Sequence, residues 1–283
     1  GRMATRKYGD AWFDHGAQFL TAHEAAFKSV VNDSSKAGDL KPWFGQETGH
    51  IRYRGEPGMT AMAKRMNEDI QVSRTALVEK VAFENGVWSI EADHSYSARH
   101  LVITYPVPQA LELFESSGQP LPEADVGYLS TISYHKCLAV LLTLGEPSGF
   151  KYPGILKYDN PEPIELVTDN QVKGVSKLPA LTVHAGPQFS EKYYTNRQPA
   201  LEEISKLVAD EHGIQITDAA IHGWKYARRI NESDRLFQGI ESLNLHFCGD
   251  SFGPPRIEGA FMSAKACVPS IAQMLESEGP SVA

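Results

Sequence analysis

The sequence predicts an α/β (α+β) fold, and two stretches carry the prediction. Leu245 to Cys248 is a short apolar run, typical of a buried strand, that leads into Gly249-Asp250 and a loop containing glycine and proline. Beyond that loop, apolar residues recur at helical spacing, at Ile257, Phe261, Ala264, Val268, Ile271 and Leu275. Asn85-Gly86 stands between two runs of strand-forming residues and predicts a β-hairpin. Helical and strand patterns are therefore mixed along the chain.

The other elements follow from the same periodicities. Further helices are predicted at 22–34, 59–66, 107–114 and 199–212. Strands are predicted at 51–53, 71–73, 76–83, 87–91, 96–99, 101–104, 133–144, 155–157, 164–168, 178–185 and 219–227. The polar stretches 31–49 and 116–123 are predicted loops, and the strand at 101–104 is expected to be fully buried.

Composition limits the classes of function. The 283 residues permit one large or two ordinary domains, and 42% hydrophobic and 22% charged residues are ordinary for a folded protein. A net charge of −8 argues against a nucleic-acid partner. The longest apolar run, Cys137 to Leu144, is too short to cross a bilayer, so no membrane partner is expected. Three cysteines make no disulfide framework and favour a reducing, cytoplasmic location.

Several common active-site motifs are absent from the sequence. It contains no G-x-S-x-G, H-E-x-x-H, C-x-x-C or P-loop pattern, and its histidines have no metal-ligand spacing on a predicted helix. The sequence therefore does not support a hydrolase or metalloenzyme function, and no metal site is expected.

The strand, Gly-Asp, loop and helix near the end of the chain suit a polar cofactor. The Asp250 carboxylate can accept hydrogen bonds from sugar hydroxyls, and the first turn of the helix has free N–H groups that attract negative charge. Gly259 and Ala260 are small enough to let a flat ring lie against that turn. The plainer alternative is an ordinary strand–loop–helix unit in which the aspartate only caps a turn.

This stretch resembles the C-terminal flavin-binding motif of the amine-oxidase-like flavoproteins, and most closely that of the renalase family. The matching positions are Gly249, Asp250, Ile257, Glu258, Gly259 and Ala260. The resemblance implies that the aspartate holds the ribityl chain of FAD and that the helix N-terminus faces the pyrimidine edge of the flavin. Pro269 departs from a smooth helix and predicts a kink near Lys265.

Two motifs near the start of the chain resemble the same family. In the segment GRMATR, Arg2 matches an arginine that meets the FAD pyrophosphate, although a solvated arginine is the alternative. In the segment DHGAQF, Gly16 and Ala17 would approach the isoalloxazine, and Gln18 would present its amide near the reactive edge. His15 is either a catalytic base or a satisfied structural group.

The middle of the chain carries weaker matches. By resemblance, the segment around Val78 bonds the adenine, and Pro106 ends a strand beside the cofactor. His184 ends the predicted strand PALTVHA, and Trp224 and Tyr226 share one face of another. Core packing is the alternative role for these two aromatic residues.

The resemblance implies two domains. Residues 1–25, 57–110 and 240–283 would form a Rossmann-like FAD domain, and 26–56 with 111–239 a substrate domain with an antiparallel sheet. A G-x-G-x-x-G fingerprint is absent. The family's first βαβ unit, about 35–40 residues, is therefore expected to be missing, and the 283 residues alone are expected to bind FAD poorly.

The function implied is that of an FAD-dependent oxidase. It would transfer hydride from 2- or 6-dihydro isomers of NAD(P)H to the flavin, which O2 would reoxidise to give H2O2. Gln18, His184 and Tyr226 would contact the small-molecule substrate. Two alternatives remain, namely a flavin-containing amine oxidase and a flavin-free relative without catalysis.

Overall fold

The computed structural model describes residues 1–231 and 233–277, and the chain divides into two compact units. The first unit comprises residues 1–70 and 135–227, and the second comprises 71–134 and the chain from 228 onward. These units do not follow the boundaries predicted for the cofactor and substrate domains, because 1–25 and 26–56 lie in one unit and 111–134 lies in the other. The assignment of cofactor and substrate roles stays a prediction.

A five-stranded sheet forms the centre of the first unit. Its strand order is β10 (Ile155–Lys157), β11 (Ile164–Asp169), β12 (Ala180–Ala185), β9 (Tyr134–Leu144) and β13 (Ile216–Arg229). The pairs β10–β11, β11–β12 and β12–β9 are antiparallel. All five strands lie where the sequence patterns predict them.

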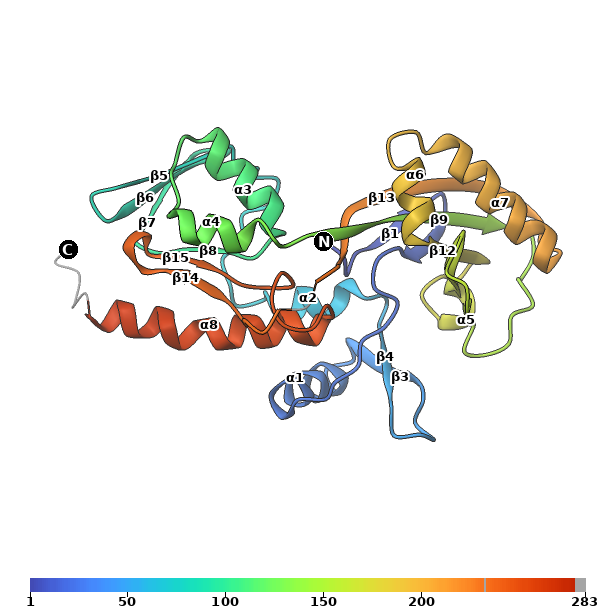
Figure 1. Cartoon of the computed structure of the whole chain (residues 1–283). Coiled ribbons are helices and arrows are strands. Elements are labelled where there is room, and N and C mark those ends of the chain that lie inside the picture. The colour runs from blue at the N-terminus through green and yellow to red at the C-terminus, as the bar shows by residue number, and fades with distance from the viewer. Residues whose placement is uncertain (232, 278–283) are drawn as a thin grey trace. The chain divides into compact units, whose positions relative to one another are not determined.

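The two faces of this sheet have different covers. Helices α6 (Pro187–Tyr193) and α7 (Gln198–His212) place Phe189, Ile204 and Val208 on one face, in a buried cluster with residues of β9 and β12, and both helices lie beside these strands in Figure 1. A hairpin of β1 (Thr5–Tyr8) and β2 (Ala11–Asp14) packs Ala11 and Phe13 against Leu141 and Ala180. Because side chains alternate along a strand, the hairpin covers the opposite face.

The remaining elements of the first unit are short. They are α1 (Ala25–Lys36), β3 (Leu40–Phe44), β4 (Arg52–Gly55), α2 (Thr60–Arg65) and α5 (Asn170–Lys173). The loop predicted over 31–49 is wrong, because α1 extends to Lys36 and β3 pairs with β4. Leu40 and Trp43 are each only 1% exposed, so these two side chains anchor β3 in the core. The lysine and proline between them interrupt the alternation that would have predicted a strand.

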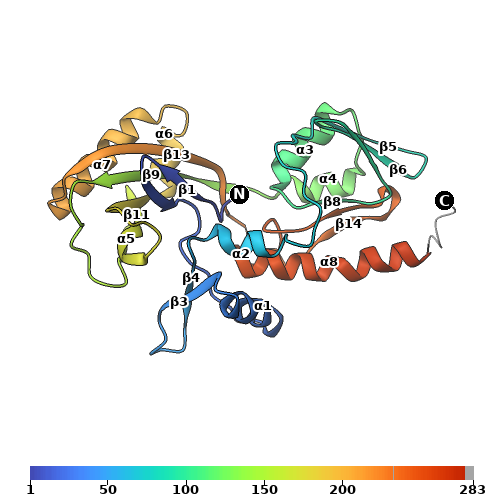
Figure 2. The same cartoon turned by 180° about the vertical axis from the view of Figure 1, so that it is seen from behind.

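A three-stranded sheet lies in the second unit. Its order is β14 (Gln238–Ile240), β15 (Leu245–Phe247) and β8 (Leu101–Ile103), and a 3₁₀ turn, η1 (Glu241–Leu243), connects the first two strands. β15 runs parallel to β8. The helices α3 (Val107–Ser116) and α4 (Glu123–Leu129) lie on one side of these strands and α8 (Ile257–Ser277) on the other, as Figures 1 and 2 show. Phe114, Leu129 and Phe247 belong to one buried core.

The second unit also contains a β-meander. It consists of β5 (Lys80–Glu84), β6 (Val87–Glu91) and β7 (Ser95–Ala98). The predicted hairpin is confirmed, since Asn85 and Gly86 adopt φ of 53° and 79°, the left-handed values that a two-residue turn requires. The strand predicted over 71–73 is wrong, and the strand predicted from residue 76 begins at Lys80. The Glu79 N–H still donates to the Glu91 carbonyl at 2.9 Å, so the pairing with β6 starts at the edge of this strand.

One burial prediction needs correction. Val102 is 40% exposed, so the strand predicted to be fully buried is not. On α8, Val268 is 61% and Leu275 38% exposed, so the face with the apolar spacing is not the buried face. The buried side of the helix carries Gly259, Ser263 and Cys267, whose small side chains permit close packing. The helix also continues through Pro269 as a single element.

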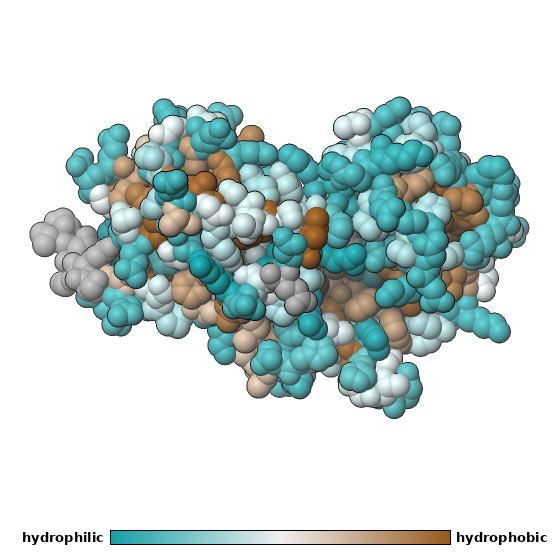
Figure 3. All heavy atoms as spheres, in the orientation of Figure 1, coloured by the Kyte–Doolittle hydropathy of each residue, from teal (hydrophilic) through white to brown (hydrophobic). Residues whose placement is uncertain are grey.

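Within residues 1–231 and 233–277, no helix is both long and apolar enough to cross a membrane. The face of the molecule in Figure 3 is mostly hydrophilic, and its apolar side chains lie in several separate groups.

Candidate functional site

The carboxyl ends of β8 and β15 meet at one edge of the second unit's sheet. The strands are parallel, and the Cys248 N–H donates to the Ile103 carbonyl at 2.9 Å just past their ends. Pro106 follows β8, and Gly249-Asp250 follows β15. In open α/β sheets, ligands bind outside the carboxyl ends of parallel strands, so this edge is the expected position of a cofactor.

The backbone at this edge leaves room only for glycine at two of the predicted positions. Gly249 has φ of +102°, and a Cβ added there would lie 2.9 Å from the Thr104 carbonyl oxygen. Its N–H donates to Ser263 Oγ on α8 at 2.8 Å. A Cβ at Gly259 would lie 1.9 Å from the Pro254 carbonyl oxygen. The loop that follows β15 is therefore pressed against the first turns of α8.

Ser251 connects this loop to the neighbouring elements. Its hydroxyl is 2.6 Å from the Tyr134 hydroxyl and accepts from the Val107 N–H, at the start of α3, at 3.3 Å. The N-termini of α3 and α8 thus lie beside the carboxyl ends of β8 and β15, and both helices orient their free N–H groups toward this edge.

The structure gathers most of the predicted cofactor residues of the second unit here. They are Pro106, Gly249, Asp250, Ile257, Glu258, Gly259 and Ala260. Glu258 is only 5% exposed. Val78 precedes β5 and is 36% exposed, so it belongs to the meander rather than to this edge.

In the first unit, the two N-terminal motifs lie against each other. The Ala17 N–H donates to the Arg2 carbonyl at 2.7 Å, and a Cβ added to Gly16 would lie 2.0 Å from the same oxygen. The Arg2 guanidinium donates to the Tyr226 carbonyl on β13 at 2.9 Å. Arg2, Gly16, Ala17 and the backbone of Tyr226 therefore lie together, and their assignment to a cofactor or substrate site stays a prediction.

Gln18 belongs to a buried polar network. Its amide nitrogen donates to the Asp14 and Gly16 carbonyls at 2.6 and 3.1 Å, and its amide oxygen accepts from Lys173 Nζ at 3.2 Å. The side chain is buried, with 4% exposure for the residue. Both ends of the Gln18 amide are therefore bonded within the protein, and these bonds hold the DHGAQF segment in its conformation.

The centre of that network is an ion pair that the sequence analysis did not find. Lys173 Nζ lies 2.7 Å from Asp14 Oδ2, and both side chains are fully buried. Asp14 Oδ1 also accepts from the Thr5 hydroxyl at 2.5 Å and the Met59 N–H at 2.9 Å. Burial lowers the pKa of Lys173, and the Asp14 carboxylate opposes this shift. Asp14 opens a recognised motif, but nothing in the four-residue helix α5 signals its partner.

Three histidines and a tryptophan form an aromatic wall beside the same motif. The His15 ring is 5.0 Å from the His222 ring and 5.1 Å from the Trp224 ring, measured between centroids, and His222 and Trp224 are 4.5 Å apart. The Trp224 N–H donates to the His15 carbonyl at 2.9 Å, and His184 Nε2 lies 3.3 Å from that oxygen. We call these four residues the His15 wall. Its geometry brings His184 and Trp224 together as backbone anchors.

The imidazoles of the His15 wall are held neutral. Burial, followed by His222 and Arg6, lowers the pKa of His15 to about 4. Burial also lowers the pKa of His184, and burial together with Arg6 and Arg197 lowers that of His222. Neutral rings next to arginines suit an uncharged or anionic ligand better than a cation. In the described part of the chain, no group of His, Cys, Asp or Glu side chains could hold a metal ion.

Solved structures share this fold at low sequence identity. A proposed protoporphyrinogen oxidase from Exiguobacterium sp. 255-15 superimposes with a TM-score of 0.62 at 16% identity, over 81% of this chain and 53% of its own. Cyclohexylamine oxidase from Brevibacterium oxydans IH-35A gives 0.63 at 16%, over 81% and 55%. The fatty acid isomerase from P. acnes that produces CLA gives 0.54 at 14%, over 75% and 52%.

The chain therefore shares its mixed α/β fold with these solved structures over 75–81% of its length. It spans about half the length of these solved structures. No protein-family model matches the sequence, and membership of the renalase family stays a prediction.

Proposed function

We propose that this protein is an FAD-dependent oxidase that takes hydride from 2- or 6-dihydro isomers of NAD(P)H and passes the electrons to O2, giving H2O2. The observation that carries the proposal is the edge where β8 and β15 end. Seven residues assigned to cofactor binding from sequence motifs gather there, around a backbone that admits only glycine at positions 249 and 259.

The residues at this edge fit FAD chemically. The Asp250 carboxylate can accept from the ribityl hydroxyls, and the N-terminus of the 21-residue helix α8 can face the electron-rich pyrimidine edge. Arg2 in the first unit offers a planar guanidinium that matches pyrophosphate oxygens. When bound, FAD supplies the hydride-accepting chemistry, and the protein contributes orientation and electrostatics.

The His15 wall supports a substrate that needs no proton removed. A dihydropyridine already carries a transferable hydride, so no catalytic base is required, and a histidine with a pKa of about 4 is a poor base at neutral pH. We assign substrate contact to His184 and Tyr226, on strands β12 and β13. We propose that Gln18 acts by holding the Gly16-Ala17 backbone in place, because both ends of its amide form hydrogen bonds with buried groups of the protein.

Amine oxidation is the competing function, and the fold shared with cyclohexylamine oxidase favours it. The charges near the His15 wall oppose it. Burial, followed by Arg6 and Arg197, lowers the pKa of His222. The positive charges of these two arginines disfavour an alkylammonium and favour a phosphate-bearing dinucleotide.

The test uses protein expressed from the complete reading frame that contains this sequence. Under anaerobic conditions, the visible absorbance band of the flavin should bleach on addition of 2- or 6-dihydro-NAD(P) and persist with cyclohexylamine. Admission of air should restore the band and release H2O2. Ordinary NADH, the 4-dihydro isomer, serves as the matched substrate control and should bleach the flavin much more slowly. Bleaching by the amine alone would establish the competing function, and a protein without flavin absorbance would remove both.

A further inference from the structure

The Arg229 guanidinium lies in an unusual environment in the second unit. It is 3% exposed, and its Nη atoms donate to the Ser251 carbonyl at 2.8 Å and to the Gly253 carbonyl. Its Nε is buried and has no hydrogen-bond partner among the described residues. No carboxylate in that part of the chain forms an ion pair with Arg229. The hydrogen-bond partners of this permanently charged group within residues 1–231 and 233–277 are thus neutral carbonyls.

Burial of an uncompensated charge is costly. An ion taken out of water loses several kcal/mol of effective hydration, and a neutral carbonyl recovers only part of that loss. An arginine cannot avoid the cost by losing its proton, because the guanidinium stays protonated in proteins. Buried arginines are therefore normally paired with an anion. The Ser251 and Gly253 carbonyls do not use all the N–H donors of Arg229. A further acceptor can therefore bind to the remaining donors.

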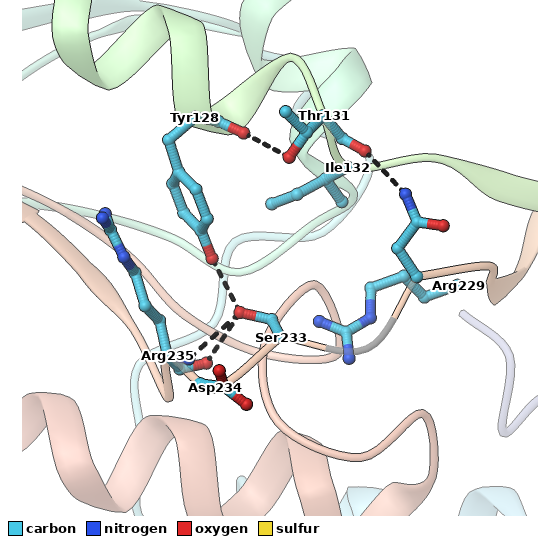
Figure 4. A pocket seen from close by; sticks show the side chains of 8 residues that line it. Tyr128, Thr131, Ile132, Arg229, Ser233, Asp234 and Arg235 are labelled. Carbon is cyan, nitrogen blue, oxygen red and sulfur yellow. Dashed lines mark hydrogen bonds between the residues drawn. The ribbon is translucent and has the colours of Figure 1, made fainter.

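A cavity of about 270 Å³ adjoins Arg229. Its other lining residues are Tyr128, Thr131, Ile132, Asn231, Ser233, Asp234 and Arg235. Figure 4 shows the Arg229 side chain reaching from the end of β13 toward the loop that carries Ser233. The Arg235 guanidinium stacks 4.0 Å above the Tyr128 ring, at the same cavity. Among the described lining residues, two guanidinium groups and one carboxylate, that of Asp234, thus give a net positive charge.

Hydrogen bonds hold the walls of the cavity together. The Tyr128 hydroxyl lies 2.7 Å from Ser233 Oγ, and the Asn231 amide donates to the Thr131 carbonyl at 3.3 Å. The Ile230 N–H donates to the Ser133 carbonyl at 2.9 Å. These hydrogen bonds connect the segment after β13 to the end of α4. The space beside Arg229 is therefore lined by backbone that hydrogen bonds hold in place.

We propose that this cavity binds a phosphate group, with Arg229 as its buried counter-ion and Arg235 as a second contact at the rim. A planar guanidinium matches two phosphate oxygens, and the low-dielectric surroundings strengthen the pairing. The volume approaches the lower end of small-molecule pockets, about 300 Å³, and leaves room for a group attached to the phosphate. The proposal does not depend on a flavin or on any redox activity.

The experiment is calorimetric titration of the protein with inorganic phosphate and, in a second arm, with a simple phosphomonoester, glycerol 3-phosphate. Sodium chloride keeps the ionic strength constant, and a chloride titration is the blank. Saturable binding of one phosphate group per chain is expected. Tighter binding of the ester than of phosphate identifies a phosphorylated small molecule as the source, and the reverse identifies free phosphate.

Three variants test the assignment. Arg229→Gln should abolish binding, and Arg235→Gln should weaken it about tenfold, the effect of one charge-assisted contact. Asp234→Asn should tighten binding, because it removes a negative charge from the lining. Arg74→Gln, an exposed arginine outside the cavity, is the matched control and should have no effect.

Arg229→Gln loses its support of the 251–253 loop and can fail to fold, but the Arg235 and Asp234 variants still decide the matter. Non-saturable binding, or equal affinity in Asp234→Asn, Arg235→Gln and the parent protein, would overturn the proposal.

Discussion

At the scale of single residues, the buried Asp14–Lys173 pair holds the recognised N-terminal motif in shape. Every carboxylate oxygen of Asp14 has a partner, and the lysine also reaches Gln18 and lies 5.2 Å from the centre of the Trp43 ring. A buried pair of this kind is satisfied as a unit, so loss of one member leaves the other charge without compensation.

Lys173→Met should therefore destabilise the protein by about 3–5 kcal/mol. The reason is that the Asp14 carboxylate would remain buried without its counter-ion. Urea unfolding followed by circular dichroism measures the change. The matched control is Lys206→Met, which removes an exposed pair with Asp210 on α7 and should cost less than about 1 kcal/mol. Equal effects of the two substitutions would contradict the assigned role of the buried pair.

His15 makes stability depend on pH. Its folded pKa of about 4 lies below the ordinary value of 6.5, so between these values the unfolded chain binds more protons than the folded one. Stability is therefore complete above about pH 6.5 and falls as the pH drops toward about 4, by at most about 3 kcal/mol. His15→Phe should reduce this dependence in urea melts at a series of pH values, and His184 and His222, whose pKa values are also lowered, should retain part of it. His50→Phe, at an exposed histidine, should leave the dependence unchanged, and a slope as steep in His15→Phe as in the parent protein would exclude His15 as a source.

At the scale of elements, the step from β15 into α8 depends on backbone that only glycine can adopt. Gly249→Ala introduces a Cβ at φ of +102°, 2.9 Å from the Thr104 carbonyl oxygen. We expect a loss of about 1–3 kcal/mol in stability, together with weaker FAD binding by the complete protein. Thermal melts and FAD titration measure the two effects.

The control for that substitution is Gly127→Ala. Gly127 lies in α4, and an added Cβ there meets nothing within 4 Å. Because alanine is the better helix former, this change should stabilise the protein by up to about 1 kcal/mol. If Gly249→Ala behaves like Gly127→Ala, the tight approach of the loop to β8 has no energetic weight.

Local chemistry decided which elements the sequence could predict. Asn85-Gly86 identified its hairpin, because few other residue pairs adopt two left-handed conformations in succession. The buried face of α8 could not be predicted from apolar spacing, because Gly259, Ser263 and Cys267 pack closely through their small size. Strand β3 escaped prediction because Lys41 and Pro42 interrupt its pattern, and only pairing with β4 reveals it.

At the scale of the whole molecule, the sequence predicted the mixed fold and the local motifs but not the contacts between distant segments. Asp14 and Lys173 are separated by 159 positions, and no spacing rule connects them. The His15 wall likewise combines residues from β12, β13 and the end of β2. The likeness to solved structures at 14–16% identity shows that the fold persists where sequence similarity has largely gone.

The proposed function assigns Arg2 and Asp250 to FAD binding. It predicts that Arg2→Ala and Asp250→Ala each weaken FAD binding by about tenfold or more, through loss of a charge-assisted contact to the pyrophosphate and of an acceptor for the ribityl hydroxyls. Quenching of FAD fluorescence by protein from the complete reading frame gives the affinities.

Two further variants separate loss of a contact from general damage. Arg2→Lys keeps the charge but loses the planar fork, so its affinity should fall between those of the parent protein and Arg2→Ala. Lys7→Ala removes a charge that is paired only with exposed Asp10 and should leave FAD binding unchanged. If Asp250→Ala weakens binding while Arg2→Ala does not, the glycine-lined edge of the second unit binds the flavin without the N-terminal motif, and the pyrophosphate must have another partner.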